Sequence, residues 1–357
     1  MKGFNKKLRG ELSTLGFRLW EFTGTALLNL FVIILLTVYL SPISYTIVTS
    51  LKTGDQLRDG SSPLWPAVLT TYTYKGKVIP VYAVPTANGT KNLALIEPHV
   101  KYSLYIDPAH PEAGPIQVDG YYRGFKKVYT PKITFSNFSQ LWSVIPYPHI
   151  LSNTLFVVIV GGLGVLASSI AVAYGFSRFR IPYGNYLFVL LIATIMIPDS
   201  ILLIPSFVIY TRVLGWNGSY LPLIVPQFFG SAVYIFLLRQ NFKSIPRDLD
   251  EAAMLDGAGP LRILVSIILP QSIPTVVTVA LLQFFNMWNE LRISSLYLGI
   301  RNDLQTMAFT AQFTPTVGFT PELLQTSTLF LLVVPIIVLF LSQRYFMQDM
   351  IITGLEK

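Results

Sequence analysis

The sequence predicts an all-α membrane protein with six transmembrane helices and a β-rich insertion outside the membrane between the first two. The chain has 357 residues, of which 52% are hydrophobic and only 12% charged, whereas soluble domains are about one quarter charged. Its apolar residues gather in stretches of roughly 20, the length that crosses the hydrocarbon core. Between the first two stretches lies a long segment rich in tyrosine, proline and short alternating runs.

The composition also excludes several classes of function. The formal net charge is +8, but no basic and aromatic surface motif is present, and basic residues commonly flank membrane spans. We therefore expect membrane lipid as a partner, and no nucleic acid. The chain has no cysteine, and no pair of its three histidines has a metal-ligand spacing, so we expect no metal site.

Residues 1–50 are expected to hold a cytoplasmic N-terminus and the first span. Residues 1–20 are polar and basic, and an apolar run follows from about Thr25 to Val48. This run is too long for the core of a signal peptide, and no cleavage site of small residues stands out. We expect an uncleaved membrane helix.

Residues 51–147 are expected to form the external β-rich domain. Strands are predicted at Lys77–Val84, Lys101–Ile106 and Val118–Tyr129, separated by turn signals at Asn88-Gly89 and Pro108–Gly114. A loosely ordered loop is the alternative interpretation.

Residues 148–346 are expected to form the transmembrane core. Its five spans are predicted at His149–Tyr174, Asn185–Ile204, Tyr220–Leu238, Ser266–Trp288 and Leu324–Phe346. The loops predicted to be cytoplasmic contain Arg178, Arg180, Arg239, Lys243, Arg247 and Arg262, whereas the short external loops contain only Arg212, Arg292 and Arg301. Because positive residues are retained inside, this bias predicts a multi-pass protein of the cell membrane whose tail, residues 347–357, is also cytoplasmic.

The cytoplasmic loop 241–263 is predicted to contain a short helix. Pro246 suits a first helical position, and Gly257 and Gly259 suit the helix end before Pro260 begins the next helix. Carboxylates favoured by the positive end of the helix dipole follow Pro246, at Asp248, Asp250 and Glu251.

This predicted helix has the character of a docking element. Ala252 and Ala253 would let the surface of another protein approach the backbone, and Met254 and Leu255 would supply apolar contact. An ordinary connecting helix is the alternative.

The spacing around this helix resembles the signature loop of ABC-importer permeases. Glu251-Ala252-Ala253 is followed after three residues by Gly257, after nine more by Ile267, and then by Leu269-Pro270. In that family the loop carries the coupling helix, which docks into a cleft of the ATPase. The resemblance implies that ATP-driven movement is transmitted by Glu251, Ala252, Ala253, Met254, Leu255, Asp256 and Gly257.

Further segments resemble the carbohydrate importers, and specifically the subunit related to the second permease of the maltose system. They are Ala173–Phe179, Met196-Ile197-Pro198, Trp288-Asn289-Glu290 and Gln343–Phe346. The resemblance covers the first span and the chain from about residue 130, and leaves out residues 55–130. It implies the type I ABC-importer permease fold and import of a sugar by alternating access. The implied partners are an ATPase dimer that binds ATP and magnesium, a second homologous permease, and an extracytoplasmic substrate-binding protein.

No phosphate-binding loop of the pattern Gly-x-x-x-x-Gly-Lys-[Ser/Thr] occurs in the sequence. We therefore expect a transport subunit with no ATPase site, no catalytic residues and no cofactor of its own. Three alternatives stay open at this point: an ABC importer for a polyamine or small ion, an ion-driven carrier, and a membrane-embedded hydrolase.

Polar residues within the predicted spans are candidates for the substrate path, because such residues are costly in a membrane. Asp199 follows Pro198 near the third span, and Glu290 closes the fifth. Helical offsets of three and seven from Gln283 place Asn286 and Glu290 on one face, with Trp288 on a neighbouring aromatic stripe. Hydrogen bonding between helices, or a position at the membrane interface, is the alternative.

Overall fold

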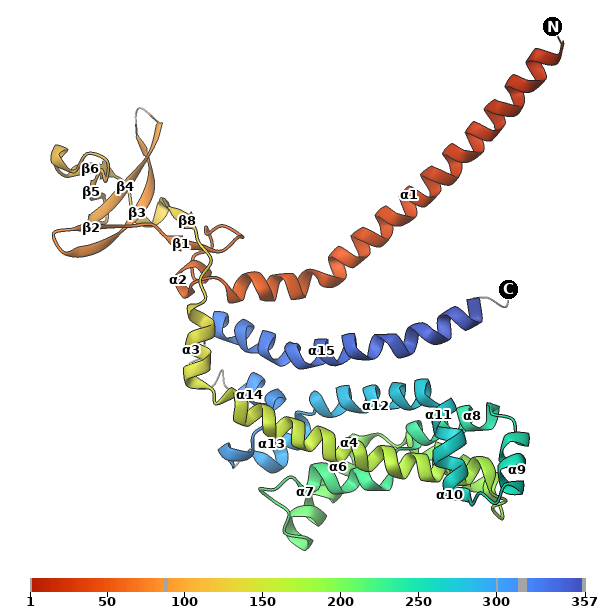
Figure 1. Cartoon of the computed structure of the whole chain (residues 1–357). Helices are drawn as coiled ribbons and strands as arrows, with labels where there is room; N and C mark the ends of the chain where they lie inside the picture. The colour runs from red at the N-terminus through yellow and green to blue at the C-terminus, as the bar shows by residue number, and fades with distance from the viewer. Residues whose placement is uncertain (1, 87–88, 300, 314–319, 355–357) are drawn as a thin grey trace. The chain divides into compact units, whose positions relative to one another are not determined.

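The computed structural model describes residues 2–86, 89–299, 301–313 and 320–354, and the chain divides into two compact units (Figure 1). One unit comprises Met1–Phe138 together with Pro321–Thr326. The other comprises Ser139–Thr320 together with Ser327–Lys357.

The first unit contains the long helix α1 (Lys2–Ser50), the short helix α2 (Gly54–Leu57) and a β-domain. The stretch Phe22–Ser50 of α1 is long and apolar enough to cross a membrane, and its most apolar window has no buried residue. Phe31 and Ile33, for example, are 64% and 59% exposed. A surface of this kind needs lipid or another apolar partner.

The β-domain is antiparallel throughout. A six-stranded sheet runs in the order β2-β3-β4-β5-β6 with β7 paired to β3, and β1 pairs with β8. The strands are β1 (Ala67–Leu69), β2 (Thr71–Tyr74), β3 (Lys77–Thr86), β4 (Gly89–Pro98), β5 (Tyr102–Ile106), β6 (Ile116–Asp119), β7 (Lys126–Lys127) and β8 (Tyr129–Pro131), with the 3-10 turns η1 (Pro111–Ala113) and η2 (Tyr122–Gly124).

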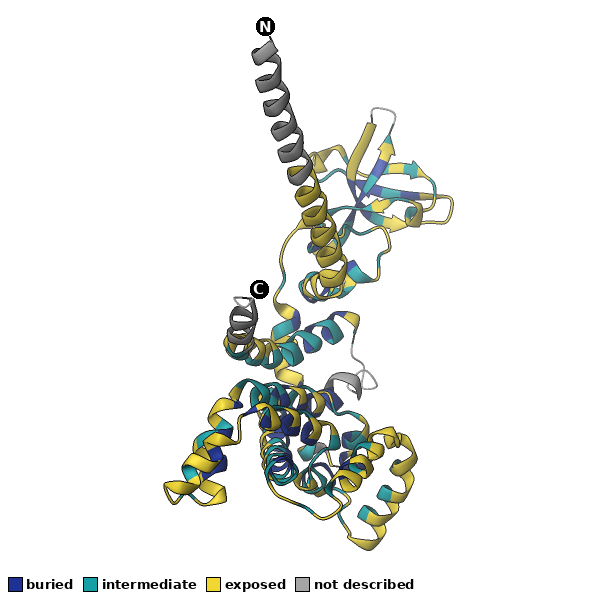
Figure 2. Cartoon of the chain, turned by 90° about the vertical axis from the view of Figure 1, so that its right-hand side faces the viewer, coloured by how far each residue is buried: buried dark blue, intermediate teal, exposed yellow. Residues whose placement is uncertain are grey.

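Strand periodicity explains the core of this sheet. Successive side chains point to opposite faces, so Tyr82, Leu93 and Tyr105 pack on one face, while their neighbours Val81 and Ala94 pack on the other. Because both faces are packed, consecutive residues of β3 and β4 are buried, and Figure 2 shows buried positions within the sheet.

The predicted strands at Lys77–Val84 and Lys101–Ile106 are confirmed as β3 and β5. The prediction of one strand over Val118–Tyr129 is wrong, because β6 ends at Asp119 and η2 separates it from β7. Gly120 has φ +118°, which breaks the extended run. The predicted Asn88-Gly89 turn lies partly outside the described residues, but Thr86 pairs with Gly89 across the hairpin of β3 and β4.

The second unit is helical. Its elements, with α3 and α15 extending into the first unit, are α3 (Ser136–Val144), α4 (Tyr147–Arg178), α5 (Gly184–Ala193), η3 (Thr194–Met196), α6 (Asp199–Val208), η4 (Ile209–Val213), α7 (Leu221–Ile224), η5 (Val225–Phe229), α8 (Ala232–Ser244), α9 (Asp248–Leu255), α10 (Pro260–Ile263), η6 (Leu264–Ile268), α11 (Leu269–Gln271), α12 (Ile273–Trp288), α13 (Arg292–Leu298), η7 (Asn302–Leu304), α14 (Met307–Phe313) and α15 (Pro321–Gly354).

Helix α4 is the centre of this unit. It packs against α8, η5 and α12, and a shared apolar core includes Ala173, Leu238 and Val279 from α4, α8 and α12. Gly161 and Gly164 allow close approach on α4, because an added Cβ would meet Met287 and Phe228 respectively.

Four described helices are long and apolar enough to span a membrane: Phe22–Ser50, Tyr147–Arg178, Leu221–Ser244 and Pro321–Tyr345. They correspond to the first, second, fourth and sixth predicted spans. The other two predicted spans are bent pairs. Gly184–Met196 and Asp199–Val213 meet at 90°, and Pro260–Gln271 and Ile273–Trp288 meet at 83°.

The third and fifth predicted spans therefore form bent helix pairs, and proline accounts for both breaks. Ile197 precedes Pro198 and is extended, with φ −79° and ψ 115°, because a residue before proline is disfavoured in the α-conformation. Pro270 and Pro274 flank the bend at Ser272 and remove two backbone donors from the helical ladder.

Candidate functional site: the exposed helix α9 and the cavity at the helix breaks

Helix α9 forms where the acidic, alanine-containing segment was expected. It spans Asp248–Leu255, with Arg247 as its N-cap, so Pro246 lies before the helix and not at its first position. The carboxylates of its first turn are stabilised by the positive end of the helix dipole.

The end of α9 is set by Gly257. This residue has φ +80°, a conformation that costs little only for glycine. The Gly257 amide donates to Met254 O at 3.0 Å, and the Ala258 amide donates to Ala253 O at 2.9 Å. These bonds close the helix, and Pro260 then begins α10, as predicted.

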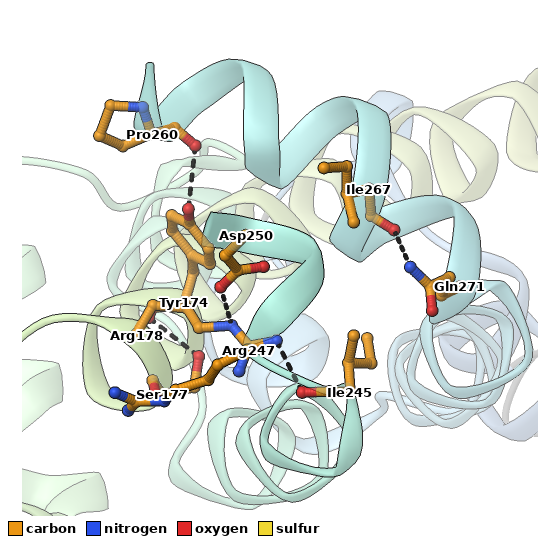
Figure 3. Close-up of polar contacts among 9 residues, drawn as sticks. All are labelled: Tyr174, Ser177, Arg178, Ile245, Arg247, Asp250, Pro260, Ile267 and Gln271. Atoms are coloured by element: carbon orange, nitrogen blue, oxygen red, sulfur yellow. Dashed lines mark hydrogen bonds and ion pairs between the residues drawn. The ribbon is translucent and has the colours of Figure 1, made fainter. Parts of the chain in front are cut away.

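A buried ion pair fixes α9 to the end of α4 (Figure 3). Asp250 Oδ2 lies 2.8 Å from Arg178 Nε, and the two side chains are only 8% and 6% exposed. A buried pair of this kind is costly to break, because the remaining charge would have no counter-ion.

Three further bonds tie the same region to α4 (Figure 3). Arg178 Nη2 donates to Ile245 O at 3.1 Å, and Arg247 Nη2 donates to Ser177 O at 3.2 Å. On the other side of α9, the Tyr174 hydroxyl donates to Pro260 O at 3.0 Å. Both flanks of α9 are thus held by the last turns of one membrane helix.

The opposite face of α9 is free within the described chain. Leu255 is 91% exposed and Met254 is 59% exposed. Ala253 is partly buried against the apolar core, and the remaining predicted docking residues are exposed: Glu251, Ala252, Asp256 and Gly257. An apolar tip on a firmly anchored helix is suited to a groove on another protein.

A second feature is a cavity of about 550 Å³ within the helical unit. It lies where two helices are interrupted, at the break after η3 and at Ser231 before α8. Irregular backbone at membrane depth is tolerated where it lines a cavity. Its lining residues are Thr194, Ile195, Ile197, Asp199, Ser231, Ala232, Val233, Tyr234, Leu282 and Asn286.

Two of the five candidate path residues line this cavity together. Asp199 is the first residue of α6, and Asn286 lies on α12. Tyr234 of α8 lines the same cavity as Asn286. The cavity therefore combines a carboxylate, an amide, hydroxyls and aliphatic side chains.

The other three candidates lie elsewhere. Gln283 is 3% exposed and donates from Nε2 to Gln227 Oε1 at 3.1 Å. Trp288 is 1% exposed and donates from Nε1 to Leu331 O at 3.2 Å. Glu290 follows the end of α12, and its Oε1 accepts from the Ile293 amide at 2.7 Å. The expected helical face does not extend to Glu290, because α12 ends at Trp288. Gln283 and Asn286 lie on α12 in different environments.

The sequence interpretation missed Ser231 and Tyr234 in this cavity. Both follow Gly230, whose φ of +79° interrupts the helix before α8. A glycine beside a polar residue within an apolar span was the signal that could have located them.

Comparison with known proteins decides the family. A family model described as "Binding-protein-dependent transport system inner membrane component" matches residues 162–352, more than half of the 357-residue chain. The chain belongs to this family. The matched range contains α9 and the cavity, and it identifies the protein as a membrane-spanning ABC transporter permease, which is a transport subunit and not a catalytic enzyme.

Several curated permease proteins are similar to this chain. The osmoprotective compounds uptake permease protein GgtD of Synechocystis is 31% identical over 203 residues, which is 56% of this chain and 67% of that protein. The alpha-glucoside transport system permease protein AglG of Rhizobium meliloti is 28% identical, over 62% of this chain and 60% of that protein. The sn-glycerol-3-phosphate transport system permease protein UgpE of Yersinia pestis is 27% identical, over 61% of this chain and 79% of that protein.

Among solved structures, a bacterial ABC transporter involved in the import of the acidic polysaccharide alginate resembles the permease. The match has a TM-score of 0.60 at 19% identity and covers 92% of this chain and 97% of the other. At this identity the likeness concerns the fold. It confirms the type I ABC permease fold that the signature loop implied.

Proposed function

We propose that this permease works in an ABC importer that moves a sugar into the cytoplasm, and that a separate ATPase drives it through α9. The observation that carries the proposal is the anchored helix with an exposed apolar tip. Force applied at Leu255 would pass through the buried Asp250–Arg178 pair directly to α4. Because α4 is the centre of the helical unit, its movement would reach α8 and α12.

The proposed partners follow from this arrangement. An ATPase dimer would bind α9 together with the equivalent helix of a second homologous permease, and an extracytoplasmic binding protein would deliver the cargo. ATP and magnesium would be bound by the ATPase. Both termini of the present chain would lie in the cytoplasm, as the distribution of basic residues predicts.

The cavity is the proposed substrate path, with Asp199 and Asn286 as its polar contacts. Its lining has one carboxylate and no lysine or arginine, which disfavours phosphate and other anions as cargo. Hydroxyls and amides suit the hydroxyl groups of a neutral sugar. The named cargo of AglG, an alpha-glucoside, agrees with that chemistry.

A polyamine is the second candidate cargo, because the Asp199 carboxylate would attract a cation. Substitution Asp199→Asn distinguishes the two in a vesicle transport assay with the whole complex. A neutral sugar should keep most of its uptake, since an amide still forms hydrogen bonds, whereas polyamine uptake should fall at least roughly tenfold. Asn286→Ala should impair either cargo, and Glu290→Gln serves as the matched control outside the cavity.

We also propose that the β-domain docks the binding protein or covers the mouth of the path. Its ends are held together by the pairing of Ala67 with Pro131, so residues 67–131 can be replaced by a short Gly-Ser linker. The shortened chain should assemble with the ATPase and lose transport. Unchanged transport would contradict this role, and a substitution at exposed Lys91 on β4 controls for general surface effects.

A further inference from the structure

A basic pocket of about 410 Å³ lies beside α9, where α4, α5 and α8 meet. Four cations line it, and its lining contains no carboxylate. None of the four has an ion pair within the described part of the chain. The cations are Arg180, Arg239, Lys243 and Arg247.

Two of these cations donate hydrogen bonds to backbone carbonyls of α4. Arg239 Nε donates to Phe176 O at 3.4 Å, and Arg247 Nη2 donates to Ser177 O at 3.2 Å. These carbonyls belong to the last turn of α4, where the negative end of the helix dipole attracts cations. The Arg239 guanidinium also lies 3.8 Å from the centre of the Phe188 ring.

The other two cations have no such contact. Arg180 and Lys243 are exposed, and no hydrogen bond to either is found in the described chain. They come from opposite sides of the pocket, Arg180 from the loop after α4 and Lys243 from the last turn of α8. The pocket therefore presents two free positive charges to whatever enters it.

The pocket continues into an apolar surface along α5. Tyr183 and Tyr186 line the pocket and are 80% and 78% exposed, and beyond them Leu190 is 68% exposed. Leu187 and Val189 on the same helix are 46% and 66% exposed. Tyrosines between a charged region and an apolar helix are typical of a membrane interface.

We propose that this pocket binds the headgroup of an anionic phospholipid, whose acyl chains lie along the exposed side of α5. Basic pockets between membrane helices are a known form of lipid headgroup site. An acidic side chain of a docked ATPase could meet the same cations, but it would leave the adjoining apolar surface of α5 uncovered. An anionic phospholipid would contact both parts of the surface, with its headgroup in the basic pocket and its acyl chains on the apolar residues of α5.

The site is next to the proposed coupling helix. Arg247 lines the pocket and is the N-cap of α9, so a bound headgroup would contact the segment that positions α9. Placing the lipid in the cytoplasmic leaflet rests on the proposed function of α9, but binding of the lipid does not. Lipid occupancy would thus make coupling sensitive to membrane composition.

The test is native mass spectrometry of the purified full chain in mild detergent, with phosphatidylglycerol or phosphatidylcholine added. In the double variant Arg180→Gln/Lys243→Gln, the ratio of phosphatidylglycerol binding to phosphatidylcholine binding should fall roughly 30-fold. This is the effect expected when two cations are removed from an anionic headgroup site. The control is Arg212→Gln/Arg292→Gln, which removes two exposed cations outside the pocket lining and makes the same change in net charge. The control should keep the wild-type preference.

Three outcomes would overturn the proposal. Equal losses in both double variants would mean a general effect of surface charge. Displacement of phosphatidylglycerol by inorganic phosphate alone would assign the pocket to a soluble anion. Unchanged lipid binding with loss of ATPase co-purification in Arg180→Gln/Lys243→Gln would assign it to the protein partner. Because the lipid assay uses the chain alone, it is independent of whether an ATPase partner exists.

Discussion

Asp250 on α9 and Arg178 at the end of α4 form a buried ion pair with an Oδ2–Nε distance of 2.8 Å. The pair joins α9, which carries the exposed Leu255, to the helix that packs against α8, η5 and α12. Together with the bonds from Arg247 and Tyr174 to backbone carbonyls, it makes α9 a rigid extension of α4. A helix that merely connected two spans would not need this anchorage.

Asp250→Ala should destabilise the helical unit, because Arg178 would remain buried without its counter-ion. The expected cost is about 3–5 kcal/mol, measured as a loss of thermal stability of the purified chain. Addition of Arg178→Met should recover part of the loss, since apolar replacement of a whole buried pair is close to neutral. The control Asp248→Ala removes an exposed carboxylate from the same helix and should have little effect. Equal losses at both positions would contradict the anchoring role.

Gly257→Ala should disturb the end of α9 through its backbone. No atom lies within 4 Å of an added Cβ at Gly257 or at Gly259, so neither substitution causes a clash. Gly257 has φ +80° and Gly259 has φ −78°, and only the positive angle costs about 1–2 kcal/mol for alanine. ATPase co-purification should therefore fall in Gly257→Ala and persist in Gly259→Ala. Retention of the ATPase by both variants would show that the positive φ at Gly257 is not needed for docking, and loss from both would show that the effect does not come from that angle.

The sequence predicted α9, its glycine end and the strands β3 and β5, because each depends on local propensity or on a simple period. It could not predict that Asp250 turns inward to Arg178 while Leu255 stays exposed, because that depends on how α9 lies against α4. The breaks at Ile197-Pro198 and Ser272 followed from prolines visible in the sequence, yet the bends of 90° and 83° are set by packing. Gln283 and Asn286 likewise differ in burial only because α12 is bounded by different neighbours.

Leu255→Ala should weaken binding of the ATPase without altering the stability of the chain. Leu255 is 91% exposed, so its truncation leaves no cavity in this protein. If the side chain is buried in the complex, the loss of apolar contact should weaken binding by roughly 10-fold or more. Leu214→Ala, on a side chain that is 45% exposed outside the α9 region, is the control. A binding assay that finds both variants equal to the wild type would exclude Leu255 from the interface.

The base of the β-domain should weaken in acid through Asp59. This carboxylate accepts a hydrogen bond from the Tyr129 hydroxyl at 2.8 Å and lies 3.7 Å from Lys127 Nζ. Burial raises the pKa of Asp59, but hydrogen bonds from Ser61 and Tyr129 and the charge of Lys127 outweigh it and lower the pKa below its ordinary value. The stabilisation is therefore present above about pH 4 and is lost as the pH falls through the lower folded value.

Hydrogen exchange around Ser61 and Tyr129, corrected for intrinsic rates, provides the measurement. Wild type and Asp59→Asn should differ near pH 6, and the difference should shrink as the pH falls below about 4, because the wild-type carboxyl is neutralised as the pH approaches its lowered folded pKa. A difference that persists unchanged in acid would show that the charge of Asp59 does not hold this region together.

The most direct test of the central claim is to tag the chain, purify it from its native membrane in mild detergent, and identify the co-purifying proteins by mass spectrometry. We predict an ATPase with a phosphate-binding loop and a second permease. Recovery of the ATPase should fall in the Leu255→Ala and Gly257→Ala variants and persist in Leu214→Ala and Gly259→Ala. Recovery of the wild-type chain alone, under conditions that keep a known ABC importer intact, would contradict the account. An ion-driven carrier would then become the leading hypothesis, with Asp199 as the first residue to test.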